Sequence, residues 1–130
     1  MMEMVPYHKP SAEKAKEITK ENRTPLAKFM TITAYVSHCF VYDYVRAIKV
    51  AKQHGVMPDI GRTWHLKMGI CQDTAAMTVG MLRAVGIKAT LFFGKADGRN
   101  HAWVEAEIDG KTYLYDHDGK AKEYKAERRY

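Results

Sequence analysis

Several features that would direct a chain to other functions are scarce in this sequence of 130 residues. It has only two cysteines, Cys39 and Cys71, with no CxxC pair, no HExxH segment and no Cys/His cluster at zinc-finger spacing. Structural zinc sites require four closely spaced ligands of these types, so we do not expect one. A disulfide between the two cysteines stays open from the sequence alone.

Long apolar runs are also absent. No stretch approaches the roughly 18 consecutive apolar residues of a membrane-spanning helix, and the first residues, MMEMVPYHKPSAEK, contain no apolar segment typical of a secretory signal. We therefore expect no membrane association and predict a cytoplasmic location for this chain. If it is trimmed from a longer secreted parent, the location would be extracellular.

The charge pattern argues against nucleic acid as a partner. Lys and Arg number 21 against 15 Asp and Glu, which leaves a net charge of +6. The basic residues are dispersed and do not interleave with aromatic residues, as nucleic-acid grooves require. A basic surface remains compatible with acidic peptides or anionic cell-wall polymers, and the favoured alternative is that it serves only solubility.

The length and a hydrophobic content of 46% fit a single domain with its own core. We interpret residues 1–23 as an N-terminal arm followed by a short charged helix that Ser11 caps, and residues 24–130 as the remaining domain. Thr24 and Pro25 begin a second helix. Its apolar residues recur at spacings of three and four, and they predict a buried stripe that comprises Leu26, Phe29, Met30, Ile32, Val36, Cys39 and Phe40. On that stripe we interpret Cys39 as a packed, inert thiol.

The next segment leads towards the other cysteine. FVYDYV breaks the helix near Tyr42, and a further helix is expected from Asp43 to His54. Residues 56–68 contain a proline and a glycine and are interpreted as a loop. Loops that lead into a reactive residue often line its cleft, so Trp64 is a candidate cleft residue. Packing of Trp64 in the core is the alternative, to which we give equal weight.

Cys71 has a setting unlike that of Cys39. It follows Gly69 and precedes a helix predicted from Gln72 to Val85, which Gly86 ends. At a helix N-terminus, unpaired N–H groups and the helix dipole favour a thiolate and can stabilise an oxyanion. We therefore interpret Cys71 as a candidate nucleophile.

Two antiparallel strands follow this helix. IKATLFFG precedes a polar turn at residues 96–100, and HAWVEAEI alternates apolar and polar residues. Asp109-Gly110 predicts a two-residue hairpin turn, after which KTYLYD forms the partner strand. Ile108 then pairs with Lys111. In that register both Asp116 and Asp118 lie on the face of His101, and the register does not choose between them.

A thiol, an imidazole and a carboxylate are the groups that nucleophilic acyl transfer needs. The imidazole accepts and returns the proton, and the carboxylate fixes its tautomer. Cys71, His101 and one of the two aspartates are the candidates.

The ordered segments GICQDTAAM, LRAVGIKATLFFG and HAWVEAEIDGKTYLYD resemble the transglutaminase-like superfamily of papain-fold thiol enzymes. That resemblance implies an α+β fold, in which N-terminal helices and a Cys-bearing helix pack on a small antiparallel sheet, in a minimal bacterial-type domain. It assigns the nucleophile to Cys71, the base to His101 and the orienting acid to Asp116. It implies no metal or organic cofactor. No oxyanion side chain can be assigned from it, so Tyr42 and Trp64 remain candidates for the oxyanion site or cleft.

Two hypotheses of different classes follow. The first is an enzyme of cysteine-dependent acyl transfer or hydrolysis at amide bonds of a peptide or protein, cell-wall peptides included, with hydrolysis favoured over crosslinking. The second is a non-catalytic binding or structural module that keeps the fold. The sequence predicts neither the substrate nor the oligomeric state.

Overall fold

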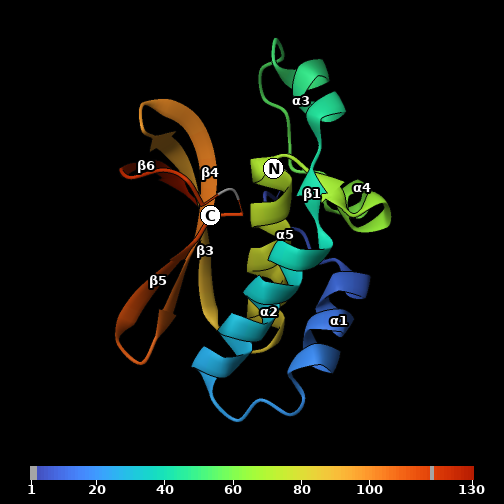
Figure 1. Cartoon of the computed structure of the whole chain (residues 1–130), viewed down its shortest axis with the longest axis vertical. Coiled ribbons are helices and arrows are strands. Elements are labelled where there is room, and N and C mark those ends of the chain that lie inside the picture. The colour runs from blue at the N-terminus through green and yellow to red at the C-terminus, as the bar shows by residue number, and fades with distance from the viewer. Residues whose placement is uncertain (1–2, 118) are drawn as a thin grey trace.

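A central helix, α5 (Cys71–Ala84), organises the computed structural model, which describes residues 3–117 and 119–130. A sheet covers one side of α5, and the other helices lie on its opposite side (Figure 1). Those helices are α1 (Lys9–Thr19), α2 (Pro25–Cys39), α3 (Tyr44–Val50) and α4 (Ile60–Leu66). The strands are β1 (Val41–Tyr42), β2 (Met68–Gly69), β3 (Lys88–Ala96), β4 (Arg99–Ile108), β5 (Lys111–Tyr115) and β6 (Tyr124–Arg129).

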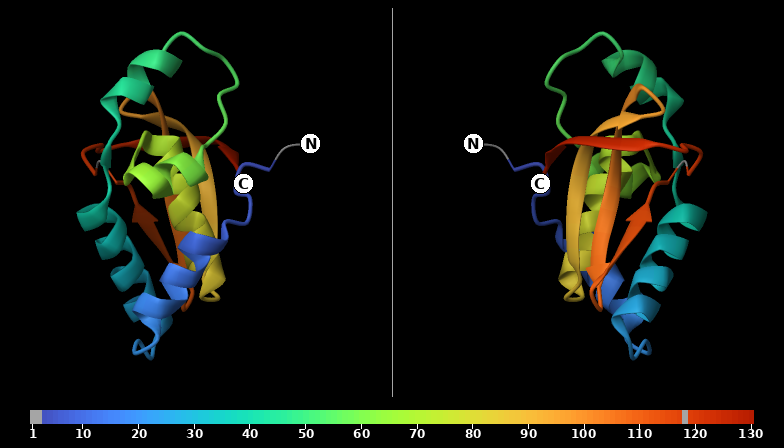
Figure 2. Two further views of the ribbon diagram at one scale, coloured as in Figure 1. Left: turned by 90° about the vertical axis from the view of Figure 1, so that its right-hand side faces the viewer. Right: turned by 90° about the vertical axis from the view of Figure 1, so that its left-hand side faces the viewer.

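The main sheet is antiparallel and has the strand order β5-β4-β3-β6. β1 and β2 form a separate, short parallel pair. β6 pairs with the last part of β3, from Phe92 to Ala96, and so lies near the turn of the β3–β4 hairpin (Figure 2). The predicted α+β fold, with the Cys-bearing helix packed on a small antiparallel sheet, is confirmed.

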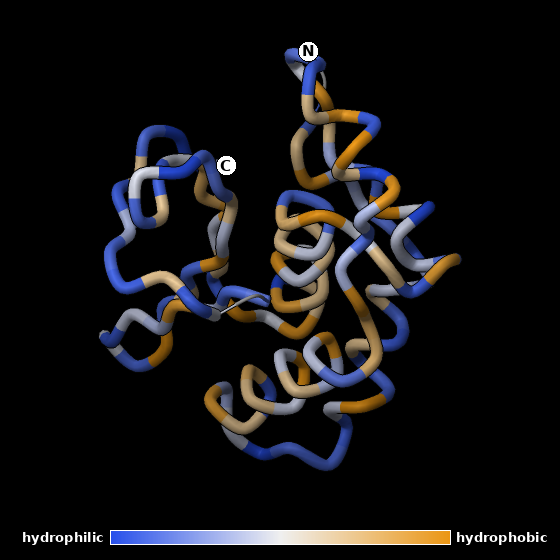
Figure 3. Tube along the Cα trace, turned by 45° about the horizontal axis from the view of Figure 1, so that its top comes forward, coloured by the Kyte–Doolittle hydropathy of each residue, from blue (hydrophilic) through white to orange (hydrophobic). Residues whose placement is uncertain are grey.

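Helix α5 is buried on almost all sides because it lies between two layers. The buried residues include Ala75, Ala76, Val79 and Leu82 and, on other sides of the helix, Thr74, Met77, Thr78 and Met81, whereas Val85, which follows the helix, is only partly buried. The buried threonines are satisfied within the helix, since the Thr78 hydroxyl donates to the Thr74 carbonyl oxygen at 2.7 Å. Hydrophobic residues recur along α5 in Figure 3, whereas the connection between α1 and α2 is hydrophilic.

The hairpin between β4 and β5 has the predicted register, from Ile108 opposite Lys111 to Val104 opposite Tyr115. Asp109 (φ 52°) and Gly110 (φ 77°) form its two-residue turn with two left-handed residues. The turn between β3 and β4 is tighter than predicted, because Asp97 and Gly98 alone make it and β4 begins at Arg99.

The prediction for Cys39 was wrong, because its side chain is exposed. Helix α2 ends at Cys39, and Phe40 occupies the last core position of the stripe with 2% of its surface exposed. Met30, also placed on the stripe, is 61% exposed. The buried face of α2 is therefore narrower than its apolar pattern suggests.

Other element boundaries differ as well. α1 begins at Lys9, with the His8 side chain as its cap, so Ser11 lies in the first turn and is buried. The expected helix from Asp43 to His54 ends at Val50. Residues 56–68, expected as a loop, contain α4, which Asp59 caps by accepting from the Arg62 N–H at 3.0 Å.

No helix within residues 3–117 and 119–130 is long and apolar enough to cross a membrane.

Candidate functional site

Cys71 is the first residue of α5, and the backbone before it is held closely. β1 pairs with β2, so that Tyr42 lies opposite Gly69. A Cβ on Gly69 would lie 2.6 Å from the Thr63 hydroxyl and 2.9 Å from the Asp73 Cβ, so only glycine fits this approach. Cys71 is thereby presented at a fixed helix N-terminus as a free, partly exposed thiol.

His101 lies on β4 and Asp116 directly follows β5, which brings their side chains together. His101 Nε2 and Asp116 Oδ2 are 2.7 Å apart, with 15% and 4% of the side-chain surfaces exposed. This hydrogen bond occupies Nε2, so Nδ1 is the ring nitrogen left for Cys71. His101 also stacks on Trp103, with ring centroids 6.4 Å apart, which limits rotation of the imidazole.

The surroundings of His101 favour its charged form. Burial alone would lower the pKa of His101, but hydrogen bonds with Asp116 and Cys71, and the negative charges that both can carry, raise that pKa to about 10. His101 is therefore an imidazolium at neutral pH, and the ring lies between two groups that stabilise its positive charge.

Asp116 has a second hydrogen-bond partner that the sequence did not reveal. The Tyr124 hydroxyl donates to Asp116 Oδ2 at 2.7 Å, and the Tyr124 ring packs edge-on against Trp103 at 5.0 Å. Tyr124 begins β6, a strand in which charged residues predominate. The signal available was weak, namely the alternation of tyrosine and alanine with charged residues that is typical of an edge strand.

Cys71 and His101 line the same cleft, which has a volume of about 400 Å³. Residues between α3 and α4 line the cleft as well, and so do residues of β3, β4 and β6. The further lining residues are Met4, Val50, Gln53, Gly55, Val56, Met57, Ile70, Gln72, Phe93, Gly94, Asn100, Ala102, Glu127 and Arg128.

The other predicted site residues lie at different places. Trp64 packs against Tyr35 and Phe40 and carries the Lys67 ammonium 3.6 Å from its ring centroid, and it does not line this cleft. Tyr42 lies on β1, beside the backbone that leads into Cys71, and it does not line this cleft either. Asp118, the alternative partner of His101, lies outside the described residues. Within the described ranges, His, Cys, Asp and Glu form no group of three or more that could hold a metal ion.

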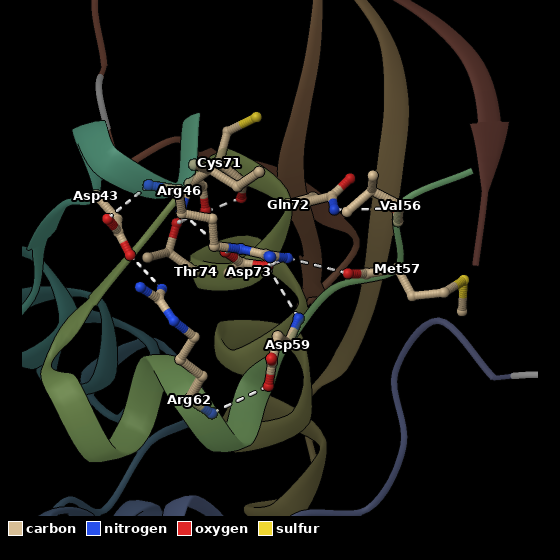
Figure 4. Close-up of polar contacts among 11 residues, drawn as sticks. Asp43, Arg46, Val56, Met57, Asp59, Arg62, Cys71, Gln72, Asp73 and Thr74 are labelled. Atoms are coloured by element: carbon tan, nitrogen blue, oxygen red, sulfur yellow. Dashed lines mark hydrogen bonds and ion pairs between the residues drawn. The ribbon is translucent and has the colours of Figure 1, made fainter. Parts of the chain in front are cut away.

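A network of buried ion pairs contacts the start of α5 (Figure 4). Asp73 is fully buried and accepts from Arg46 Nε at 2.7 Å and from a terminal Arg46 nitrogen at 3.0 Å. Its carboxylate also accepts the backbone N–H groups of Asp59 at 2.9 Å and Ile70 at 3.0 Å. One carboxylate thus joins α3, the loop before α4 and the residue before Cys71.

A second ion pair extends this network. The Asp43 carboxylate accepts from the Arg46 N–H at 3.0 Å and from the Arg62 guanidinium. The Arg46 N–H, followed by the Arg62 side chain, holds the pKa of Asp43 below its usual range. Figure 4 shows the Cys71 sulfur pointing away from these ion pairs, so the network positions the helix end without contacting the thiol.

Removing Arg46 should destabilise the fold strongly. Arg46→Ala leaves the buried Asp73 carboxylate without its charged partner, so we expect a loss of about 3–5 kcal/mol in the free energy of unfolding. Urea denaturation measures this loss. The matched control is Lys88→Ala, which breaks an exposed pair with Glu107 and should cost less than about 1 kcal/mol. Similar losses in both variants would contradict a structural role for the buried pair.

Comparisons with known proteins identify the family and the fold of the chain. The transglutaminase-like superfamily profile matches residues 12–116. No curated protein matches the chain significantly. A crystal structure of a candidate cysteine protease from Cytophaga hutchinsonii is similar, with a TM-score of 0.70, 19% identity, and coverage of 91% of this chain and 42% of that one.

Two further solved structures resemble the chain. A candidate protease from Parabacteroides distasonis has a TM-score of 0.66 at 19% identity, over 82% of this chain and 22% of its own. A transglutaminase structure has a TM-score of 0.66 at 18% identity, over 92% of this chain and 32% of its own. The chain therefore spans less than half the length of each of these proteins. Since the family profile matches most of its residues, the chain belongs to the transglutaminase-like superfamily.

Proposed function

We propose that the chain is a thiol hydrolase of amide bonds in peptides or proteins, with Cys71 as nucleophile, His101 as acid and base, and Asp116 as the orienting carboxylate. The observation that carries the proposal is the position of His101. Its Nε2 is hydrogen-bonded to Asp116 at 2.7 Å, and its ring also interacts with Cys71 in a shared cleft. Membership of a family that includes thiol enzymes supports the same chemistry.

In the first half of the reaction, the Cys71 thiolate attacks the carbonyl carbon of the substrate amide. The resulting oxyanion is stabilised by N–H groups of the first turn of α5. The His101 imidazolium donates its Nδ1 proton to the departing amine as the C–N bond breaks. The products of this half are a free amine and a thioester on Cys71.

In the second half, neutral His101 accepts a proton from water, and the hydroxide attacks the thioester carbonyl. Collapse of this intermediate breaks the C–S bond and releases a carboxylic acid, whose proton is lost to solvent, while the thiolate and imidazolium reform. Asp116 holds the imidazole in one orientation throughout and stabilises its charge. A primary amine in place of water would give a crosslink instead.

Product analysis distinguishes the two outcomes. The protein is incubated with a mixed peptide library in ¹⁸O-labelled water, with and without a primary amine, and the products are identified by mass spectrometry. Hydrolysis predicts peptides that carry one ¹⁸O at a new carboxylate and that Cys71→Ala does not produce. Amine adducts without ¹⁸O products would show transfer rather than hydrolysis, and no Cys71-dependent product at all would favour a non-catalytic module.

Tyr124 is expected to contribute to turnover through Asp116. Tyr124→Phe removes one hydrogen bond to a carboxylate while leaving the ring packed on Trp103, so we expect kcat to fall about tenfold with KM little changed. Tyr113→Phe is the control, since its ring packs on Phe29 and its hydroxyl makes no hydrogen bond within the described part of the chain. Equal kcat values for Tyr124→Phe and wild type would exclude this role.

A further inference from the structure

One side of the cleft bears a preorganised guanidinium. Arg128 lies on β6 opposite Phe93 of β3, and its Cζ lies 5.2 Å from the centroid of the Phe93 ring. Both residues line the cleft that contains Cys71 and His101. Stacking on an aromatic ring restricts the guanidinium plane and leaves its N–H edge available for a carboxylate, which an arginine can bind through two parallel hydrogen bonds.

A β-bulge interrupts the regular pairing of this part of β6 with β3. Pairing with β3 shifts between Phe93 and Gly94, so that Glu127 is the additional residue between Ala126 and Arg128. A Cβ on Gly94 would lie 2.0 Å from the Lys125 carbonyl oxygen, so the close approach of the bulged strand requires glycine at this position. Gly94 also pairs with His101 on β4, which places the bulge next to the imidazole.

The charges around the cleft are uneven. Among the described residues that line it, Arg128 is the only lysine or arginine and Glu127 the only acidic residue, and His101 adds a second positive charge at neutral pH. The side between α3 and α4 contributes uncharged residues, Val50, Gln53, Gly55, Val56 and Met57. No carboxylate of residues 3–117 and 119–130 forms an ion pair with Arg128. Within that part of the chain, no carboxylate neutralises the charge that Arg128 presents to a ligand.

We propose, building on the function proposed above, that the cleft selects peptides bearing a carboxylate close to the scissile amide, and that Arg128 is the residue that binds this carboxylate. The carboxylate is an acidic side chain or the C-terminus of the peptide. Arg128 is in this account a specificity-determining residue of the same cleft, and it takes no part in bond breaking.

The neighbouring arginine provides a matched control. Arg129 lies one residue further along β6, stacks on Phe92 with its Cζ 5.6 Å from the ring centroid, and does not line the cleft. Arg128→Gln and Arg129→Gln therefore remove the same charge from the same strand, each beside one phenylalanine. Only the first removes it from the cleft.

The decisive test uses two small reagents and does not depend on turnover. Cys71 is alkylated at pH 7 and low salt with iodoacetate, which is an anion, and with iodoacetamide, which is neutral, in a Cys39→Ala background. In both reactions the thiolate sulfur bonds to the CH2 carbon and iodide leaves. We expect Arg128→Gln to lower the ratio of the iodoacetate rate to the iodoacetamide rate about threefold or more, and Arg129→Gln to leave it nearly unchanged.

Equal ratios for the two variants, or a ratio in Arg128→Gln equal to that of wild type, would overturn the proposal whether or not the protein hydrolyses peptides. Failure of the hydrolase function would appear instead as an absence of Cys71-dependent peptide products with the ratio still dependent on Arg128. Glu127→Gln is expected to raise the ratio, and a decrease would also contradict the proposal.

Short peptides then identify the source of the carboxylate. Four alanine tripeptides are compared: one with a free C-terminus, one with an amidated C-terminus, and two with both ends blocked that carry a central glutamate or a central lysine. For each peptide we measure how much it slows the alkylation of Cys71 by iodoacetamide. Protection by the glutamate peptide indicates a side-chain carboxylate, and protection by the free C-terminus indicates a terminal one. Stronger protection by the lysine peptide than by either carboxylate peptide would overturn the proposal and identify Glu127 as the recognition residue.

Discussion

Cys71→Ala is expected to abolish thiol-dependent turnover, by about 10⁴-fold or more in kcat, while the protein still folds. The reason is chemical, because no other group of the described cleft is a thiol and the mechanism needs a thiolate to attack the amide. Turnover is followed with any peptide that the library experiment identifies, and folding is followed by circular dichroism.

Cys39→Ala is the natural control because it removes the same group from a different setting. Cys39 is exposed at the end of α2, so no core cavity forms and we expect a change of less than about 0.5 kcal/mol in the free energy of unfolding, with turnover unchanged. Comparable losses of turnover in both variants would mean that Cys71 has no special role.

Asp116→Asn should give the second large effect. Asparagine keeps the size of the side chain but removes the negative charge that stabilises the His101 imidazolium, and it permits the imidazole to adopt the wrong tautomer. We expect kcat to fall by orders of magnitude, up to about 10⁴-fold. The measurement is steady-state kinetics, with circular dichroism to confirm that the variant folds.

Asp118→Asn separates the two carboxylates that the hairpin register leaves as candidates. Asp116 accepts hydrogen bonds from His101 and Tyr124, so we expect Asp118→Asn to change kcat by less than about tenfold, or ~1.4 kcal/mol of activation free energy. A larger effect for Asp118→Asn than for Asp116→Asn would reverse the assignment and make Asp118 the orienting carboxylate.

The sequence was most informative where local rules decide the structure. Asp109 and Gly110 specify a two-residue turn, and that turn determines the register from Ile108 to Val104. The start of α5 at Cys71 follows from similarly local signals, a glycine before the helix and a regular apolar spacing within it. These two elements position Cys71 and His101, so the main features of the candidate site could be predicted.

The sequence was least informative where contacts between distant residues decide the structure. Arg46 and Asp73 are 27 positions apart, and nothing local to either indicates a buried ion pair. β6 is stabilised by pairing with β3, and its own charged composition does not indicate a strand. For this reason the sequence did not predict that Tyr124 and Arg128 lie near the site. Cys39 was misplaced because an apolar spacing does not indicate where the neighbouring elements stop covering a helix.

The central claim is that Cys71 and His101 form a thiolate–imidazolium pair, and the pH dependence of alkylation tests it most directly. The pKa of His101 is raised to about 10, so the ring keeps its proton, and its positive charge beside Cys71, from pH 6 up to about pH 9. The measurement is the rate of Cys71 alkylation by iodoacetamide between pH 6 and pH 9, in a Cys39→Ala background, with and without His101→Ala.

With His101 present, the rate should be nearly constant over this range and, at pH 6, at least about tenfold higher than in His101→Ala. In His101→Ala, which lacks the positive charge beside the sulfur, the rate should rise steadily with pH over this range. Identical pH profiles for the two proteins would contradict the ion pair and, with it, the proposed mechanism.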